Sequence, residues 1–340
     1  DAPGDRVYVG LPQAIMPFDS LKYGNNRLAL AKWLTDKRNP LTSRVFVNRM
    51  WQEFFGRGLV KTSGDFGMQG EMPSHPELLD WLAIDFIEHG WNIKRLIKQL
   101  VMSSTYRQST VVTKDKLAVD PENILLAHGP RSRMTAETIR DMALASSGLL
   151  VKEIGGPSVK PYQPKGIWEL ATSGRGILAR YVQDHGDKLY RRGLYSFIKR
   201  TVPPPVMLVF DASNRDQCEV NRLRTNTPLQ ALVLLNDPLV LEASRVFAEK
   251  LMKENSSMEE KVLIAFRSIA CRTPQDEELK ILVNYLEEEK HKFAGATEKA
   301  KEFIRAGEYP HAEIQDVTSL AALMQVVHTI YNMEESITKV

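Results

Sequence analysis

Basic side chains gather in one stretch of this 340-residue chain, between Lys188 and Arg224. The stretch holds eight lysines and arginines against three acids, Asp211, Asp216 and Glu219. Guanidinium groups bind oxyanions through paired hydrogen bonds, and a helix start adds the partial positive charge of its free amides. The spacing therefore predicts a site for an anionic ligand just before the apolar run that begins at Pro228, with these side chains as candidates: Arg215, Arg222, Arg224 and Asn226. The alternative is that the arginines pair with Asp and Glu and hold an extended loop against helices.

A second set of residues could do acid–base chemistry. Asp65 lies in a glycine-rich loop, "KTSGDFGMQGEMPS", and His75 follows that loop directly. If this loop and the central segment converge in the fold, these two side chains would join Asp211 and Asp216 as general acids and bases. Such a set would suit a hydrolase or lyase acting on polysaccharide. The competing interpretation of His75 is a histidine that hydrogen-bonds its own turn.

One tryptophan is a candidate ligand contact. Trp168 lies in a Pro/Gly-rich region, "GGPSVKPYQPKGIWE", where its ring could stack on a sugar. The other tryptophans at helical apolar positions are better explained by core packing.

The composition excludes several classes of protein. The net charge is +3, from 45 basic and 42 acidic residues, which is too balanced for a nucleic-acid-binding surface. No apolar run approaches the length of a membrane span. The two cysteines, Cys218 and Cys271, form no metal-binding or haem-attachment pattern, so we expect no metal and no haem in this segment. Their spacing leaves one disulfide and two free thiols equally open.

The elements that position these residues are predicted to be helices. Apolar residues recur at helical spacing after Asn26, before Gly56 and before Gly148, and Ser74 with Glu77 has the spacing of a capping box. Between Gly155 and Asp216 the pattern changes, and "GLYSFIKR" and "VMLVFD" have the composition of short strands or extended segments. The sequence thus predicts a mainly α, bundle-like protein with an irregular, partly extended middle. We expect a linker over 1–25, a helical part over 26–150, an irregular segment over 151–226 and a second helical part over 227–340.

The segment "RTNTPLQALVLLNDP" joins the basic stretch to this second helical part. Thr227 precedes Pro228, and Gln230 is the third residue after Thr227. This order is typical of the start of a helix. We predict a capped, buried helix over "TPLQALVLL", with chemistry confined to the preceding "RTN".

Four separated motifs give the chain a family resemblance. The segments are "NRLALAKWLTDKRNPLTSRVFVNRMWQEFFGRGLVKTSGDFG", "PSHPELLDWLA", "LYRRGLYSFIKRTVPPPVMLVFDASNRDQC" and "RTNTPLQALVLLNDP". Together they resemble the PSD1 family (the DUF1553 domain), which is abundant in Planctomycetes. The resemblance implies an exported, periplasmic or cell-surface protein, in which other domains, often cytochrome c-like, precede this one. It also implies a link to surface electron transfer or polysaccharide use, with any haem in a separate domain. It implies no reaction and no catalytic residues. We therefore expect a module that binds a partner domain or an anionic polysaccharide, and the alternative is a polysaccharide-active hydrolase or lyase.

Overall fold

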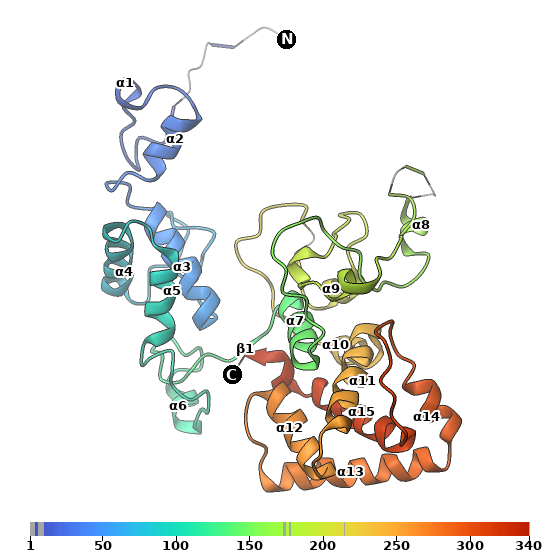
Figure 1. The fold of residues 1–340 in the computed structure, drawn as a ribbon. Coiled ribbons are helices and arrows are strands. Elements are labelled where there is room, and N and C mark those ends of the chain that lie inside the picture. The colour runs from blue at the N-terminus through green and yellow to red at the C-terminus, as the bar shows by residue number, and fades with distance from the viewer. Residues whose placement is uncertain (1–3, 6–9, 173–174, 177, 214, 340) are drawn as a thin grey trace. The chain divides into compact units, whose positions relative to one another are not determined.

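The computed structural model describes residues 4–5, 10–172, 175–176, 178–213 and 215–339, and it is mainly α-helical, as predicted (Figure 1). The chain divides into two compact units, Asp1–Arg131 and Ser132–Lys339. Helix α7 (Ala136–Ser147), which the sequence placed in the N-terminal helical part, belongs to the second unit. Each unit has its own hydrophobic core.

The first unit is built on three helices, α3 (Thr42–Phe55), α4 (Pro76–Glu88) and α5 (Ile93–Met102). Their apolar faces share one core, which includes Val47, Trp51, Leu79, Leu82 and Leu96. The shorter helices of this unit are α1 (Ser20–Tyr23), α2 (Arg27–Leu34) and α6 (Lys114–Val119). The predicted caps hold at two points, since the Asn26 side chain accepts from the amide of Ala29 and Gly56 ends α3 in the left-handed conformation.

The predicted capping box at the start of α4 is wrong. His75, rather than Ser74, is the residue that precedes the first helical turn, and its side chain makes no capping bond. Ser74 instead donates both its backbone amide and its hydroxyl to the carbonyl of Leu59, at 2.8 and 3.3 Å. The glycine-rich loop ends on this contact, so tertiary pairing to residue 59 displaces the local cap.

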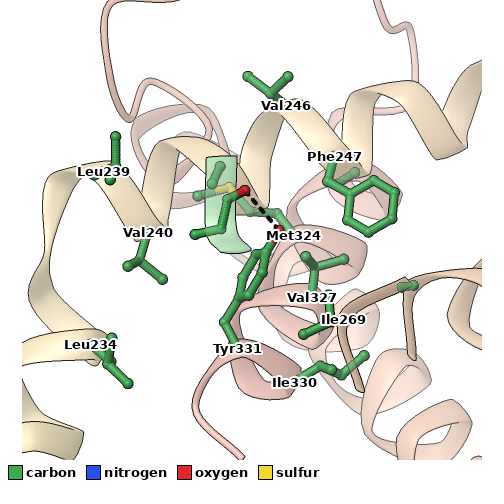
Figure 2. Packing of buried hydrophobic residues seen from close by; sticks show 14 of the residues in the cluster. Leu234, Leu239, Val240, Val246, Phe247, Ile269, Met324, Val327, Ile330 and Tyr331 are labelled. Carbon is green, nitrogen blue, oxygen red and sulfur yellow. Dashed lines mark hydrogen bonds between the residues drawn. The ribbon is translucent and has the colours of Figure 1, made fainter. Parts of the chain in front are cut away.

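The second unit surrounds one buried helix, α15 (Val317–Tyr331). The helices around it are α7, α11 (Pro238–Lys253), α12 (Met258–Ala270), α13 (Asp276–Ala294) and α14 (Thr297–Phe303). Figure 2 shows Met324, Val327, Ile330 and Tyr331 of α15 among apolar residues of α11 such as Val240. Because α15 is covered on nearly all sides, it is the centre of this unit's core.

Of the two strands or extended segments predicted in the central segment, one is a helix and the other is partly extended. "VMLVFD" is helical instead, as α9 (Pro205–Val209), because Pro205 suits a first helical turn and Asp211 then leaves the helix with a φ of 56°. Over "GLYSFIKR" the chain makes a short 3₁₀ helix, Gly193–Tyr195, and then isolated bridges from Ser196 to Val159 and from Lys199 to Val202. The other central elements are α8 (Ile167–Thr172) and a 3₁₀ helix, Gly186–Tyr190.

Two strands pair elsewhere in the second unit. β1 (Ser132–Arg133) runs antiparallel to β2 (Thr338–Lys339), which follows a 3₁₀ helix at Glu334–Ile337. This pairing joins the beginning of the second unit to its end and leads directly into α7.

Helix α10 (Pro228–Asn236) begins where the sequence predicted but is not a buried helix. Gln230 and Leu234 are its buried residues, whereas Leu229, Leu232 and Leu235 are 52%, 56% and 47% exposed. Thr227 precedes the first turn without a capping bond from its side chain. The Gln230 side chain donates to the carbonyls of Val209 and Thr225, so it fastens α10 to the preceding segment rather than capping it.

In the part of the chain that the structure describes, no helix combines the length and apolar character needed to cross a membrane.

The one-sided burial of α10 predicts unequal effects of two matched substitutions. Leu234→Ala removes a side chain that is 2% exposed and should lower the free energy of unfolding by about 2–5 kcal/mol. Leu232→Ala, on the exposed side of the same helix, should change it by less than about 0.5 kcal/mol. Urea denaturation of the two variants tests the difference, and equal losses would contradict the exposed face.

An ion-paired cap on α13 predicts an acid-sensitive contribution to stability. Glu278 accepts from Arg272 at 2.7 and 2.6 Å and from the backbone amide of Gln275, and these bonds lower its pKa to about 2. A carboxylate with a lowered pKa stabilises the fold above its unfolded pKa and loses that contribution as the pH falls towards its folded pKa. Glu278→Gln should therefore cost about 1 kcal/mol at neutral pH, because the pair is about one-third exposed, and almost nothing near pH 2.

The control for this experiment is Glu277→Gln, an exposed carboxylate in the same first turn. Chemical denaturation across the pH range should show a smaller and flatter effect for the control. A Glu278→Gln cost that does not change with pH would contradict the assignment.

Candidate functional site

The predicted anion-binding residues lie on a loop that is closed by Asp211. The Asp211 carboxylate accepts from the backbone amide of Thr225 at 2.7 Å and from its hydroxyl at 2.8 and 3.1 Å. This contact brings the two ends of the 211–225 loop together at the end of α9. Asp211 therefore has a structural role in this unit.

Arg222 is held in place by a glutamate of α7. Its guanidinium donates to both oxygens of Glu137, at 2.8 and 3.0 Å, in a paired geometry. Burial raises the pKa of Glu137, but the hydrogen bonds and charge of Arg222, together with hydrogen bonds from the Glu137 amide and the Thr135 side chain, leave the pKa below its usual value. Arg222 therefore pairs with a glutamate and holds its loop against a helix, which is the alternative to an anion site.

Three arginines nevertheless meet around one small hollow in the second unit. Arg222 and Arg224 come from the 211–225 loop and Arg133 from β1. The remaining walls are formed by Met134, Thr135, Phe210, Asp211 and Leu223. We call this hollow the arginine recess. Arg133 and Arg222 are half-buried and Arg224 is exposed, so the recess opens towards solvent. The other two predicted residues, Arg215 and Asn226, are exposed and lie outside its lining.

A larger pocket lies on the other side of Phe210. It is formed by α7, α9, the α10–α11 junction and the proline-rich segment 161–164, and it encloses about 660 Å³ of space including its mouth. We call it the α7–α11 pocket. Its walls are mostly apolar: Ile139, Pro161, Pro164, Pro204, Pro205, Val206, Met207, Phe210, Leu239 and Val240.

Four polar side chains line this apolar pocket, namely Arg140, Tyr162, Ser196 and Asp237. The hydroxyl of Tyr162 accepts from the amide of Glu308 at 2.9 Å. Ser196 is 7% exposed, and among the described residues its hydroxyl has no hydrogen-bond partner. The same holds for the buried Nε of Arg140, whose Nη2 donates to the carbonyl of Leu189. Asp237 uses Oδ1 to cap α11, accepting from the amides of Leu239 and Val240 at 2.8 and 3.2 Å. Its second oxygen accepts no hydrogen bond from the described residues.

Burial dominates the electrostatics of this pocket. It raises the pKa of the Asp237 carboxyl and lowers the pKa of the Arg140 guanidinium, and the attraction between the two groups opposes both shifts. An apolar pocket with a few convergent polar groups and displaced pKa values has the general character of a ligand site.

The backbone at Gly193 places Ser196 beside α7. A side chain at Gly193 would come within 2.8 Å of the Cα of Glu137, so only glycine allows this close approach. The amide of Gly193 also donates to the Asp141 carboxylate at 2.7 Å. Sequence reasoning missed Arg140, Ser196 and Asp237. The available signal was an arginine beside Ile139 and Ala143 on the inward side of an amphipathic helix.

Trp168 is placed differently from the prediction. It is 1% exposed, and its ring packs edge-on to Tyr181 and beneath the ammonium of Lys199, 4.4 Å from the ring centroid. A ring buried in this way stabilises the central segment and presents no open face for stacking on a sugar.

The acid–base candidates are divided between the two units. Asp65 accepts from the amide of Gly67 at 2.7 Å inside its own loop, and His75 contacts the hydroxyl of Ser74 at 3.0 Å. Both lie in the first unit, whereas Asp211 and the exposed Asp216 lie in the second. The contact of His75 with its neighbour is the local turn bond that the competing interpretation described.

Within the described ranges, no three His, Cys, Asp or Glu side chains gather in a way that could hold a metal ion. Cys218 and Cys271 are both free and exposed, so the structure has two thiols and no disulfide between them.

Comparison with known proteins gives one match. The sequence model of a protein family described as PSD1, protein of unknown function (DUF1553), matches residues 26–286. Neither the characterised proteins nor the solved structures include a match to the chain.

The unpartnered hydroxyl of Ser196 predicts a stabilising substitution. Ser196→Ala should raise the free energy of unfolding by about 1 kcal/mol, because a buried hydroxyl without a partner loses its hydration and gains nothing. Ser147→Ala is the matched control, since Ser147 is fully buried and donates to the carbonyl of Ala143 at 2.7 Å. The control should lower stability by about as much. Thermal or urea unfolding measures both, and a loss of stability in both variants would show that Ser196 has a partner.

Proposed function

The chain belongs to the PSD1 family of proteins of unknown function (DUF1553), and we propose that it is a binding module that holds an anionic polysaccharide at the arginine recess. The observation that carries the proposal is the convergence of Arg133, Arg222 and Arg224 on one hollow from two segments far apart in the sequence. Planar guanidinium groups match the oxygens of carboxylate groups and of sulfate esters, which are the anionic groups of polysaccharides.

The recess is organised before any ligand arrives. Glu137 holds the guanidinium of Arg222 in a fixed orientation, and the bonds from Thr225 to Asp211 hold the loop that carries Arg222 and Arg224. A preorganised loop loses less conformational entropy on binding than a free one. The residues that line the recess include three arginines and one acid, Asp211, so the charge of its lining favours an anion.

The biological setting is part of the same proposal. The family resemblance supports export to the periplasm or cell surface, where polysaccharides are met. It also supports preceding domains of the same polypeptide as partners, with any haem held by one of them. The recess would then attach the whole protein to a charged glycan.

The proposal is tested by substituting Arg133 and Arg224 while Arg222, which holds the loop to α7 through Glu137, is kept. The double variant Arg133→Ala and Arg224→Ala should bind dextran sulfate or polygalacturonate about tenfold or more weakly, since each lost charge-assisted contact is worth about 1.5–3 kcal/mol before screening. Isothermal titration calorimetry measures this, and wild-type affinity should fall with added salt.

Two controls separate specific binding from general charge. Arg215→Ala removes an exposed arginine of the same loop that lies outside the recess, and it should leave the affinity nearly unchanged. Neutral dextran should not bind. Equal losses for the Arg215 variant and the double variant, or equal affinity for charged and neutral dextran, would refute the proposal.

A further inference from the structure

We propose that the α7–α11 pocket is a second and separate binding site, for a small molecule with an apolar body and one planar group that both accepts and donates hydrogen bonds. A primary carboxamide is the simplest group of this kind. The site does not depend on the arginine recess, because it uses different polar side chains: Arg140, Ser196 and Asp237.

The walls determine the body of the ligand. Four prolines, Phe210 and the aliphatic side chains of α7, α9 and α11 surround the space, and they offer no hydrogen bonds from their side chains. An aromatic or branched aliphatic group gains from burial against such walls, whereas a charged or heavily hydroxylated group loses its hydration there. The prolines also keep the backbone of this region rigid, so the pocket is preformed.

The polar side chains determine the head group. The hydroxyl of Ser196 and the Nε of Arg140 are buried donors without partners among the described residues. The second oxygen of Asp237 is an acceptor, because the first is used by the cap of α11. A carboxamide can accept from the donors through its carbonyl oxygen and donate to Asp237 through its NH₂ group.

Other head groups fit less well. A carboxylate could accept from Arg140 and Ser196 but would bring its negative charge to the Asp237 carboxylate. An ammonium could approach Asp237 but would meet the guanidinium of Arg140. Because both charges stand at the same pocket, a neutral group with a donor and an acceptor complements them best.

The buried polar atoms argue that the pocket is not a mere packing defect. Buried donors in folded proteins nearly always have partners, yet among the described residues Arg140 Nε and Ser196 Oγ at this pocket have none. A ligand that satisfies Ser196 and Arg140 together removes this deficit.

A single substitution tests the head group directly. In Asp237→Asn the amide oxygen can keep the cap of α11, while the second atom changes from an acceptor to a donor. Wild-type protein should bind benzamide more tightly than benzoate or toluene in ligand-observed NMR titrations at about pH 8. In Asp237→Asn the preference should reverse, with benzoate gaining and benzamide losing about tenfold.

Further variants keep the test decisive. Ser196→Ala should weaken benzamide binding several-fold in a protein that remains folded, and it does not disturb the α11 cap. Asp187→Asn changes an exposed aspartate of the Gly186–Tyr190 helix outside the pocket and should leave all three affinities unchanged. No saturable benzamide binding, equal effects of Asp237→Asn on benzamide and benzoate, or a matching effect of Asp187→Asn would overturn the proposal. Because dextran sulfate binding is measured separately on the arginine variants, either proposal can fail without the other.

Discussion

The burial of α15 is the constraint on which the second unit depends. Eleven of its fifteen residues are buried, so neighbouring helices must cover it on nearly every side. A helix of this kind gains most of its stability from packing rather than from its own propensity. Two polar contacts also orient its neighbours. The hydroxyl of Tyr331 bonds to Ser146 of α7 at 2.7 Å, and His328 bonds to the carbonyl of Leu234 in α10 at 3.2 Å. The helices that form both proposed sites are therefore aligned from the core outwards.

Helix α7 carries polar side chains that support both proposed sites. Its inward residues, Ile139 and Ala143, lie in the core, while three polar residues of the same helix contact three different neighbours. Glu137 holds the loop of the arginine recess, Arg140 enters the α7–α11 pocket, and Asp141 binds the backbone at Gly193. Since one rigid helix supports all three contacts, the recess and the pocket have a fixed relation within this unit. Phe210 lines both.

A buried ion pair shows how polar groups also shape the far side of α11. Arg245 and Glu249 are paired at 2.6 Å with almost no exposure, and Arg245 donates to the carbonyls of Ala306 and Tyr309. The backbone at Gly307 passes so close to Glu242 that a side chain there would overlap it. These contacts bind the segment between α14 and α15 to α11. Along the sequence they look like an ordinary charged helix face, because nothing local distinguishes a solvated Arg–Glu pair from one that a distant loop covers.

The sequence by itself determined the helical class, the ends of several helices and the start of α10, because apolar periodicity, Asn26, Gly56, Gly148 and Pro228 act over a few residues. It also pointed to Arg222 and Arg224 through the local excess of basic residues. Tertiary structure alone decided which face of α10 is covered, that "VMLVFD" is a helix, and that Trp168 is buried. It alone brought Arg133 to the recess and Ser196, Arg140 and Asp237 to one pocket. The physical reason is that apolar periodicity shows only that one face of a helix is covered. It does not show which distant segment covers that face, and a binding site depends on which segments meet.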